Sequence, residues 1–316
     1  MDGLSNQIRE AIKPYGYQAR TVSIVHLPEI QNAVGRLVRQ GSIDRRISQT
    51  WHFFMKTNDS LPEAKIIIVV AMPQPFTRLK FKWQRKTFLA DIPPTYFTRA
   101  DDSRAEKILK EILEPAGYRI VKAHLALKTL AVRSGMAEYG KNNISYISGM
   151  GSLYQLVAFY SDYPGEEENW QGPRVMDVCT DCTLCRQVCP NGCITAGRFL
   201  IHAEKCLGFL SEREPDIPHW AKYQPEWSNA LIGCMLCQFV CPVNKPYLHK
   251  VTDGLSFSEA ETSAILENTP WEGLSPGTRK KLDDIRLAYP MMPRNLEELI
   301  KKQQTDPSTG LIKRKI

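Results

Sequence analysis

The sequence predicts an α+β (α/β) protein that carries a separate cysteine-rich module, and three observations support this. Segments with strand-like and helix-like patterns alternate through residues 1–165, as in domains where helices pack on a sheet. All nine cysteines lie between residues 179 and 241. The remainder, 247–316, shows helical patterns interrupted by prolines. We therefore expect three parts, at 1–165, 170–246 and 247–316, with a charged and exposed link at 166–170.

Hydrophobic periodicity places the individual elements. Apolar residues at helical spacing predict helices, whereas alternating or continuous β-branched runs predict strands. In the first part the expected helices are 4–12, 27–38, 101–113 and 121–133. The expected strands are 21–25, 64–72, 144–147 and 154–160. The stretch 64–72 (AKIIIVVAM) has the unbroken apolar run of a strand buried on both faces. In the last part, helices are expected at 257–266, 280–289 and 296–302.

Two stretches of the first part show no clear period. Residues 76–95 are basic and aromatic, which fits either a nucleic-acid contact or a surface loop that covers a pocket. Residues 44–59 contain Trp51, Phe53 and Phe54, and we expect these aromatic side chains to serve packing.

Composition describes an ordinary globular protein, with 43% hydrophobic and 24% charged residues. The longest apolar run is too short to span a bilayer. The amino terminus lacks the basic-then-apolar order of a signal peptide. We therefore expect a cytoplasmic protein without membrane contact. The net charge of +7 permits acidic partners, such as a low-potential ferredoxin, a flavodoxin or tRNA, without distinguishing among them.

The cysteines follow the spacing of a two-cluster ferredoxin. The first run is Cys179-x2-Cys182-x2-Cys185-x3-Cys189-Pro190, which is the bacterial spacing for [4Fe–4S] ligation. A wider set follows: Cys206, then Cys234-x2-Cys237-x3-Cys241-Pro242. In two-cluster ferredoxins the cysteine before the proline ligates the other cluster, and we expect a helix that begins there to turn it away. The expected ligands are Cys179, Cys182, Cys185 and Cys241 for the first cluster, and Cys189, Cys206, Cys234 and Cys237 for the second.

Other uses of these cysteines fit the spacing less well. Disulfides suit small secreted domains, and structural zinc takes four ligands without needing paired Cys-Pro endings. Cys193 is the ninth cysteine and is left over. We expect it to be a small buried apolar residue.

Three passages make the sequence resemble the epoxyqueuosine reductases and the related reductive dehalogenases. The first is 131–142 (AVRSGMAEYGKN), which is similar to the family's Gly-Lys-Asn turn. The second is 151–164, whose Ser-Asp-Tyr-Pro end is similar to a dehalogenase motif. The third is the cysteine module, with 205–211 and 233–242. Weaker matches at 61–69 and 96–100 extend the resemblance over roughly residues 60–245.

This resemblance implies a nitroreductase-like domain that holds a base-off cobalamin, beside a ferredoxin-like module whose two [4Fe–4S] clusters supply electrons. It implies an oxidoreductase that acts on a small-molecule or nucleoside substrate, with the cofactor supplying the difficult chemistry. Two alternatives stay open. One is an electron-transfer or reductive-activation protein for a corrinoid protein or another partner enzyme. The other is a nitroreductase-like protein that binds flavin.

The sequence departs from the family at the expected proton donor. Epoxyqueuosine reductases carry a proposed donor Asp upstream of the Gly-Lys-Asn turn, and the corresponding segment Val121–His124 has no carboxylate. The remaining candidates for catalysis are titratable side chains: Lys141, Tyr139, Tyr96 and His124.

The Gly-Lys-Asn turn is also the expected cofactor contact, through Gly140, Lys141 and Asn142. Gly140 is expected there because glycine permits a positive φ. For Lys141 a surface ion pair is the alternative, and for the tyrosines and His124 it is a packing role.

Overall fold

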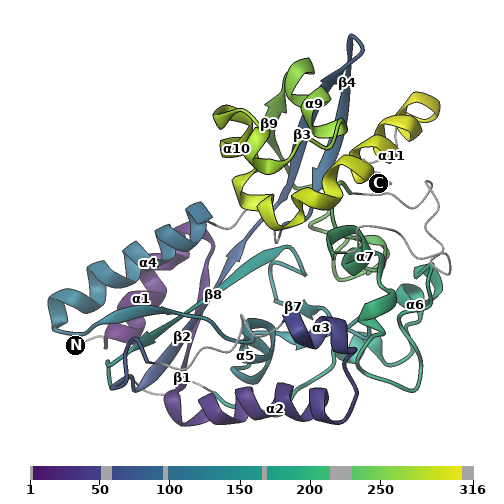
Figure 1. Ribbon diagram of the computed structural model, residues 1–316. Helices are drawn as coiled ribbons and strands as arrows, with labels where there is room; N and C mark the ends of the chain where they lie inside the picture. The colour runs from purple at the N-terminus through teal and green to yellow at the C-terminus, as the bar shows by residue number, and fades with distance from the viewer. Residues whose placement is uncertain (1–2, 51–58, 95–98, 166–168, 214–229, 308–316) are drawn as a thin grey trace. The chain divides into compact units, whose positions relative to one another are not determined.

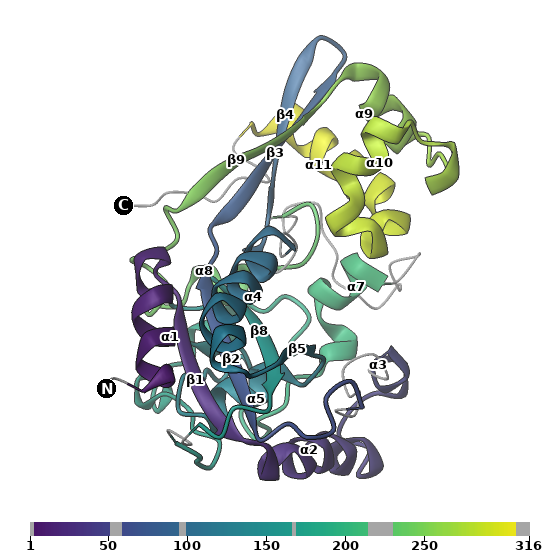
Figure 2. The same cartoon turned by 90° about the vertical axis from the view of Figure 1, so that its left-hand side faces the viewer.

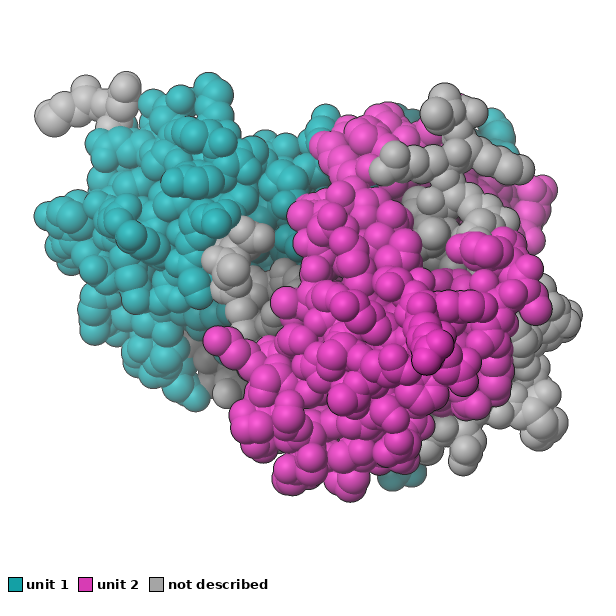
Figure 3. Space-filling model, turned by 90° about the horizontal axis from the view of Figure 1, so that it is seen from above, with its two compact units in different colours: residues 1–74, 98–182 teal, residues 75–97, 183–316 magenta. Residues whose placement is uncertain are grey.

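The computed structural model describes residues 3–50, 59–94, 99–165, 169–213 and 230–307, and it confirms a mixed fold of helices and sheets (Figure 1). The chain forms two compact units, coloured separately in Figure 3. Unit 1 comprises residues 1–74 and 98–182, and unit 2 comprises 75–97 and 183–316. These units do not coincide with the three expected ranges, because 75–97 groups with the C-terminal half and the boundary after Cys182 divides the cysteine module. No helix in the described ranges is long and apolar enough to cross a membrane.

Unit 1 is built on a four-stranded antiparallel sheet in the order β1-β2-β8-β5. The strands are β1 (Gln18–Ser23), β2 (Ile66–Pro73), β8 (Tyr154–Ser161) and β5 (Ile120–Ala123). A two-stranded ribbon of β6 (Glu138–Tyr139) and β7 (Ser145–Tyr146) belongs to the same unit. β2 is buried along almost its whole length, which accounts for its unbroken apolar sequence.

Helices cover both faces of this sheet (Figure 1). One face carries α1 (Leu4–Ile12) and α4 (Arg99–Leu113), and the other carries α2 (Leu27–Arg39) and α5 (Leu127–Arg133). Alternate residues of β2 serve the two faces: Ile66 and Ile68 pack in the first core, and Ile67 and Val69 in the second. A short helix, α3 (Arg45–Thr50), follows α2. The predicted aromatic cluster at Trp51 lies outside the described residues.

The expected helix at 121–133 is wrong in its first half. Residues 120–123 form β5, which pairs with β8, and only Leu127–Arg133 is helical. The sequence offers no proline or glycine at this change, and the available partner strand overrides the helical period. His124 therefore lies exposed between strand and helix instead of on an amphipathic helix.

The link at 166–170 ends at Trp170, and this residue is less exposed than expected. Trp170 stacks on His26 with ring centroids 4.1 Å apart, and its indole N–H donates to Glu29 at 2.9 Å. Arg133 covers the same ring and pairs with Glu29. These contacts fasten the chain to α2 and α5 shortly before the first cysteine.

Unit 2 contains a three-stranded sheet in the order β4-β3-β9 (Figure 2). The strands are β3 (Phe76–Trp83), β4 (Lys86–Ile92) and β9 (Val251–Phe257). Residues 76–92 are thus a β-hairpin, and the expected surface loop is wrong. Its turn residues Gln84 and Arg85 both have positive φ, 50° and 61°, without the Asn-Gly sequence that signals such turns.

The C-terminal helices pack on this sheet. They are α9 (Glu259–Leu266), α10 (Pro276–Leu282), the 3-10 segment η10 (Asp283–Met291) and α11 (Met292–Thr305). The part of the cysteine module that lies in unit 2 adds α6 (Leu184–Val188), α7 (Leu207–Arg213) and α8 (Leu236–Phe239). The part after residue 246 is therefore not purely helical, since it opens with β9, which pairs in parallel with β3.

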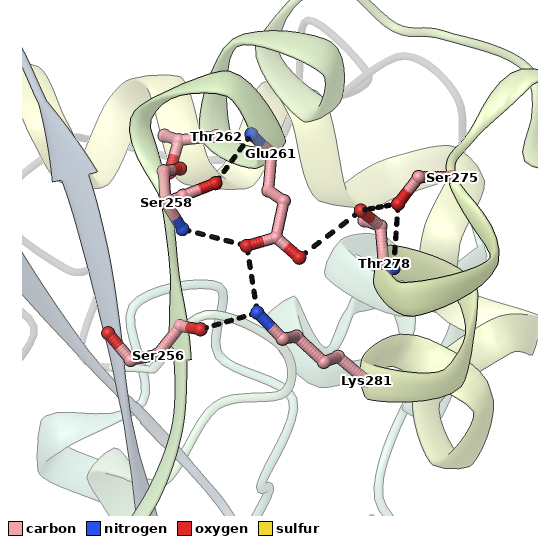
Figure 4. Close-up of polar contacts among 7 residues, drawn as sticks. All are labelled: Ser256, Ser258, Glu261, Thr262, Ser275, Thr278 and Lys281. Atoms are coloured by element: carbon pink, nitrogen blue, oxygen red, sulfur yellow. Dashed lines mark hydrogen bonds and ion pairs between the residues drawn. The ribbon is translucent and has the colours of Figure 1, made fainter.

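One carboxylate joins α9, α10 and β9 (Figure 4). Glu261 accepts a hydrogen bond from the Ser258 main chain at 2.8 Å, while the Ser258 hydroxyl accepts one from the Glu261 N–H. This reciprocal pair is a capping box. Lys281 donates to Glu261 at 2.8 Å and to the carbonyl of Ser256 at 2.8 Å. The pKa of Glu261 is lowered: burial alone would raise it, but these hydrogen bonds outweigh that effect.

Candidate iron–sulfur site

The two cysteine runs have matching local structure. Cys185 lies in α6 and Cys237 lies in α8. Helix α6 ends directly before the Cys189-Pro190 pair, and α8 ends with one residue between it and the Cys241-Pro242 pair. The residues that precede the helices have nearly the same backbone angles, with φ −124° and ψ 2° at Thr183 and φ −108° and ψ 5° at Met235. The helices contact each other. The sequence repeat is therefore also a structural repeat.

The expected helix start at each Cys-Pro pair is wrong. Turns follow Pro190 and Pro242, and the short helices lie before the cysteines instead. Cys189 leaves α6 in an extended conformation, with ψ 110°. A residue before proline is restricted to this region because the proline ring clashes with a helical backbone. The proline itself therefore redirects the cysteine away from the helix that precedes it.

The side chains of Cys189 and Cys206 both contact Cys193, the cysteine that is not among the expected ligands. The Cys193 main-chain N–H donates to the Cys189 sulfur at 3.3 Å, and its thiol hydrogen-bonds to both of the other sulfurs. This bonding lowers the pKa of Cys189 to about 6 and lowers the pKa of Cys206 as well. It raises the pKa of Cys193, which is 2% exposed and thus buried as predicted.

Cys206 also lies beside the start of the second cysteine run. A Cβ atom added to Gly208 would lie 3.5 Å from the Cys206 sulfur and 3.6 Å from the Cys234 main-chain nitrogen. Ser211 stabilises this contact between α7 and the second cysteine run. Its hydroxyl accepts a hydrogen bond from the Gly233 N–H at 2.9 Å and donates one to the Gly208 carbonyl at 3.0 Å. Cys189, Cys206 and Cys234 therefore gather around α7, which suits a shared ligand set.

The cysteines are available as ligands. All nine are free. Cys179 is buried at the end of a 3-10 turn, and the other expected ligands are partly exposed. Within the described ranges, no three His, Cys, Asp or Glu side chains are arranged around a site for a single ion.

The Gly-Lys-Asn turn joins β6 to β7 and is closed by its own hydrogen bonds. Asn142 is 2% exposed; its amide donates to the Tyr146 hydroxyl at 2.8 Å and accepts from the Ile144 N–H at 3.2 Å. Gly140 does not have the expected positive φ. Glycine is required for space instead, because a Cβ atom would lie 2.6 Å from Asn142 Oδ1. The positive φ of this turn, 58°, belongs to Asn143.

Lys141 extends from this turn to the first cysteine loop. Its ammonium group donates to the Thr180 carbonyl at 2.8 Å and to the Cys182 carbonyl at 3.3 Å. The contacts of Gly140 and Asn142 thus lie within the turn, and those of Lys141 are made with the first cysteine loop. A cofactor contact of these three residues stays a prediction.

The other predicted catalytic side chains are not gathered around Lys141. Tyr139 is 6% exposed, and its hydroxyl donates to Thr129 at 3.4 Å; burial raises its pKa. His124 is exposed beyond β5. Tyr96 lies outside the described residues. The described ranges therefore place Tyr139 as a packed residue and bring no second candidate to it.

Lys128 is a polar residue that the sequence did not single out. Its ammonium group donates to the carbonyl of Asn143 at 2.7 Å and to its side-chain oxygen at 3.0 Å. Burial lowers the pKa of Lys128 to about 8. In sequence it resembles any lysine of an amphipathic helix, so only the contact with Asn143 reveals that it stabilises the strained turn.

Comparison with known proteins agrees with this geometry. Residues 178–244 match the family described as "4Fe-4S double cluster binding domain". An epoxyqueuosine reductase of Leadbetterella byssophila is 33% identical over 141 residues, which cover 44% of this chain and 44% of that protein. One of Cyclobacterium marinum is 31% identical over 182 residues, covering 56% and 54%. The aligned chain spans about half the length of the curated relatives it matches.

The likeness of fold extends further than the likeness of sequence. The structure of epoxyqueuosine reductase from Streptococcus thermophilus superimposes with a TM-score of 0.64 over 96% of this chain and 82% of that chain, at 18% identity. The chain has the fold of an epoxyqueuosine reductase. A structure of such an enzyme with a tRNA-Tyr stem loop gives a TM-score of 0.60 at 19% identity, covering 96% and 83%. The resemblance that the sequence indicated is therefore confirmed for this family.

Proposed function

We propose that this chain is a cytoplasmic iron–sulfur oxidoreductase with two [4Fe–4S] clusters. The first cluster would be held by Cys179, Cys182, Cys185 and Cys241, and the second by Cys189, Cys206, Cys234 and Cys237. The observation that carries this proposal is the repeated helix-and-cysteine geometry at α6 and α8. Paired runs of this kind suit the passage of single electrons from a low-potential donor, such as a ferredoxin or flavodoxin.

The chain prepares its sulfurs for ligation through hydrogen bonds. Cys189 receives them from the main chain of Asn191, Cys193 and Ile194, and Cys206 from the main chain of Gly208 and Phe209. Such bonds favour the thiolate, which is the form that binds metal. They also contribute to the reduction potential of a bound cluster.

The proposal extends to a base-off cobalamin as electron acceptor and to a small-molecule or nucleoside substrate. Cobalamin supplies low-potential cobalt chemistry when bound. The likeness of fold to epoxyqueuosine reductases supports this extension, and a nucleoside carried in tRNA is the substrate class that the names of these proteins suggest. The Gly140 turn adds no support, because its polar groups are used within the chain.

A second candidate is an electron-transfer or activating protein for a corrinoid-containing partner. The observation in its favour is the segment Val121–His124, which has no carboxylate where the enzymes carry their proposed proton donor. Asp102 of α4 contacts this segment, and its carboxylate is paired with Lys122 at 2.5 Å.

Anaerobic purification and reconstitution separates these candidates. We expect about eight iron and about eight sulfide per chain, from two clusters of four each. Corrin absorbance in addition supports the cobalamin-dependent enzyme, clusters without corrin support the electron-transfer protein, and flavin absorbance supports a flavin enzyme. Protein that binds no iron–sulfur cluster after reconstitution overturns the proposal.

A further inference from the structure

The Lys141 ammonium group binds main-chain carbonyls of the first cysteine loop rather than a carboxylate. Thr180 and Cys182, its two acceptors, lie within the loop that opens at Cys179. In the part of the chain that the structure describes, Lys141 makes no ion pair. Its positive charge is therefore directed at the loop and is not neutralised by an acidic partner.

Both ends of this contact are held in place. On the lysine side, the turn is closed by a hydrogen bond from the Gly140 N–H to the Ile144 carbonyl at 2.7 Å. On the loop side, the Tyr139 N–H donates to the Arg174 carbonyl at 2.8 Å, and the Met176 N–H donates to the Tyr139 carbonyl at 2.9 Å. The ribbon whose turn carries Lys141 thus also pairs, through Tyr139, with the chain that leads into Cys179, so the lysine and the loop are tied to each other at two places.

We propose that Lys141 is a positioning residue that also tunes the first cluster. Its ammonium group holds the loop from Cys179 to Cys182 in the shape that presents both sulfurs, and its fixed charge favours the reduced form of the cluster. This inference rests on the proposed function, in which these cysteines bind a [4Fe–4S] cluster. Reduction adds one electron, so a nearby cation stabilises the reduced state more than the oxidised state.

Four variants of the full chain test this inference. Lys141→Met removes the charge and the hydrogen bonds, Lys141→Gln removes the charge but keeps a donor, and Lys141→Arg keeps the charge. Lys107→Met is the matched control, since it removes the same charge from a side chain that is 76% exposed on α4. After anaerobic reconstitution, each protein is titrated with reductant while electron paramagnetic resonance follows the clusters. The release of iron to a chelator is timed separately.

In Lys141→Met and Lys141→Gln, we expect one of the two midpoint potentials to become more negative while the other stays unchanged. About half of the iron should leave faster in Lys141→Met than in the unaltered chain, because one of two equal clusters is affected. Lys141→Arg and Lys107→Met should keep both potentials close to the original values. If Lys141→Met does not fold, as judged by circular dichroism, Lys141→Gln decides.

Unchanged potentials and iron release in Lys141→Met and Lys141→Gln overturn the inference while leaving the proposed function intact. An unaltered chain that binds no cluster overturns the proposed function itself. The two failures are therefore distinguishable in one series of measurements.

Discussion

Asp91 joins the β3–β4 hairpin to the segment that leads into Cys234, which makes it the most informative position for a stability test. Its side chain is 1% exposed and accepts two hydrogen bonds from Arg78, at 2.7 Å from Nε and 2.9 Å from Nη2. Its main-chain carbonyl accepts from the Leu231 N–H at 3.1 Å. The hydrogen bond with Asp91 raises the pKa of Arg78, so the contact favours the charged form of the guanidinium.

We expect Asp91→Ala to destabilise unit 2 by about 3 kcal/mol. Removing one partner of a buried ion pair costs about 3–5 kcal/mol, because the other charge is left without compensation. The lower end applies because the Arg78 side chain is 21% exposed and can recover some hydration. For a domain of about 150–250 residues this corresponds to a fall of about 6–12 °C in Tm. Thermal melting followed by circular dichroism measures it.

Two further variants distinguish the contribution of the Arg78–Asp91 ion pair to stability from that of other charges on the same sheet. Arg78→Met with Asp91→Leu removes both charges and should recover most of the loss, since apolar residues often replace a buried pair without cost. Asp253→Ala breaks the exposed pair with Lys80 on the same sheet and should cost less than about 1 kcal/mol. A loss below about 1 kcal/mol in Asp91→Ala, equal to that of Asp253→Ala, would refute this reasoning.

Three other changes give independent checks. Because the pKa of Glu261 is lowered in the folded chain, its contribution to stability is present above the ordinary pKa and is lost as pH falls through the folded value. Urea denaturation should therefore show Glu261→Gln less stable than the original at pH 7, with the two converging as the pH falls below the ordinary pKa of a glutamate; a difference that does not change with pH would contradict this. Arg85→Gly should raise stability by about 0.5–1 kcal/mol in the same assay, because glycine adopts the positive φ of 61° without strain. A loss of stability would count against the turn. Cys193→Ala should keep the full iron content while Cys206→Ala loses about half, because only Cys206 is an expected ligand. Equal iron loss in both would show that Cys193 is a ligand.

Local patterns in the sequence predict those helices and strands whose hydrophobic periodicity alone determines the structure they adopt. The helices at 4–12 and 27–38 and the buried strand β2 lie close to their predicted places, since their periodicity agrees with the faces they bury. The cysteine spacing also indicated the double-cluster module that the family match confirms at 178–244.

The misses have physical causes that no local pattern carries. The hairpin at 76–92 turns on Gln84 and Arg85, whose positive φ values are set by the flanking strands rather than by turn-forming residues. The sequence predicts a helix where β5 forms, because the pairing of β5 with β8 depends on a strand far along the chain. The contact of Lys141 with Thr180 joins residues 39 positions apart, so only the folded chain shows it.

Iron and acid-labile sulfide analysis, combined with electron paramagnetic resonance of the reduced, reconstituted protein, will determine whether this chain holds two [4Fe–4S] clusters. We predict about eight iron and about eight sulfide per chain, with the signal of two interacting clusters on full reduction. Binding of about two zinc ions per chain without sulfide, or of a single cluster, would contradict it.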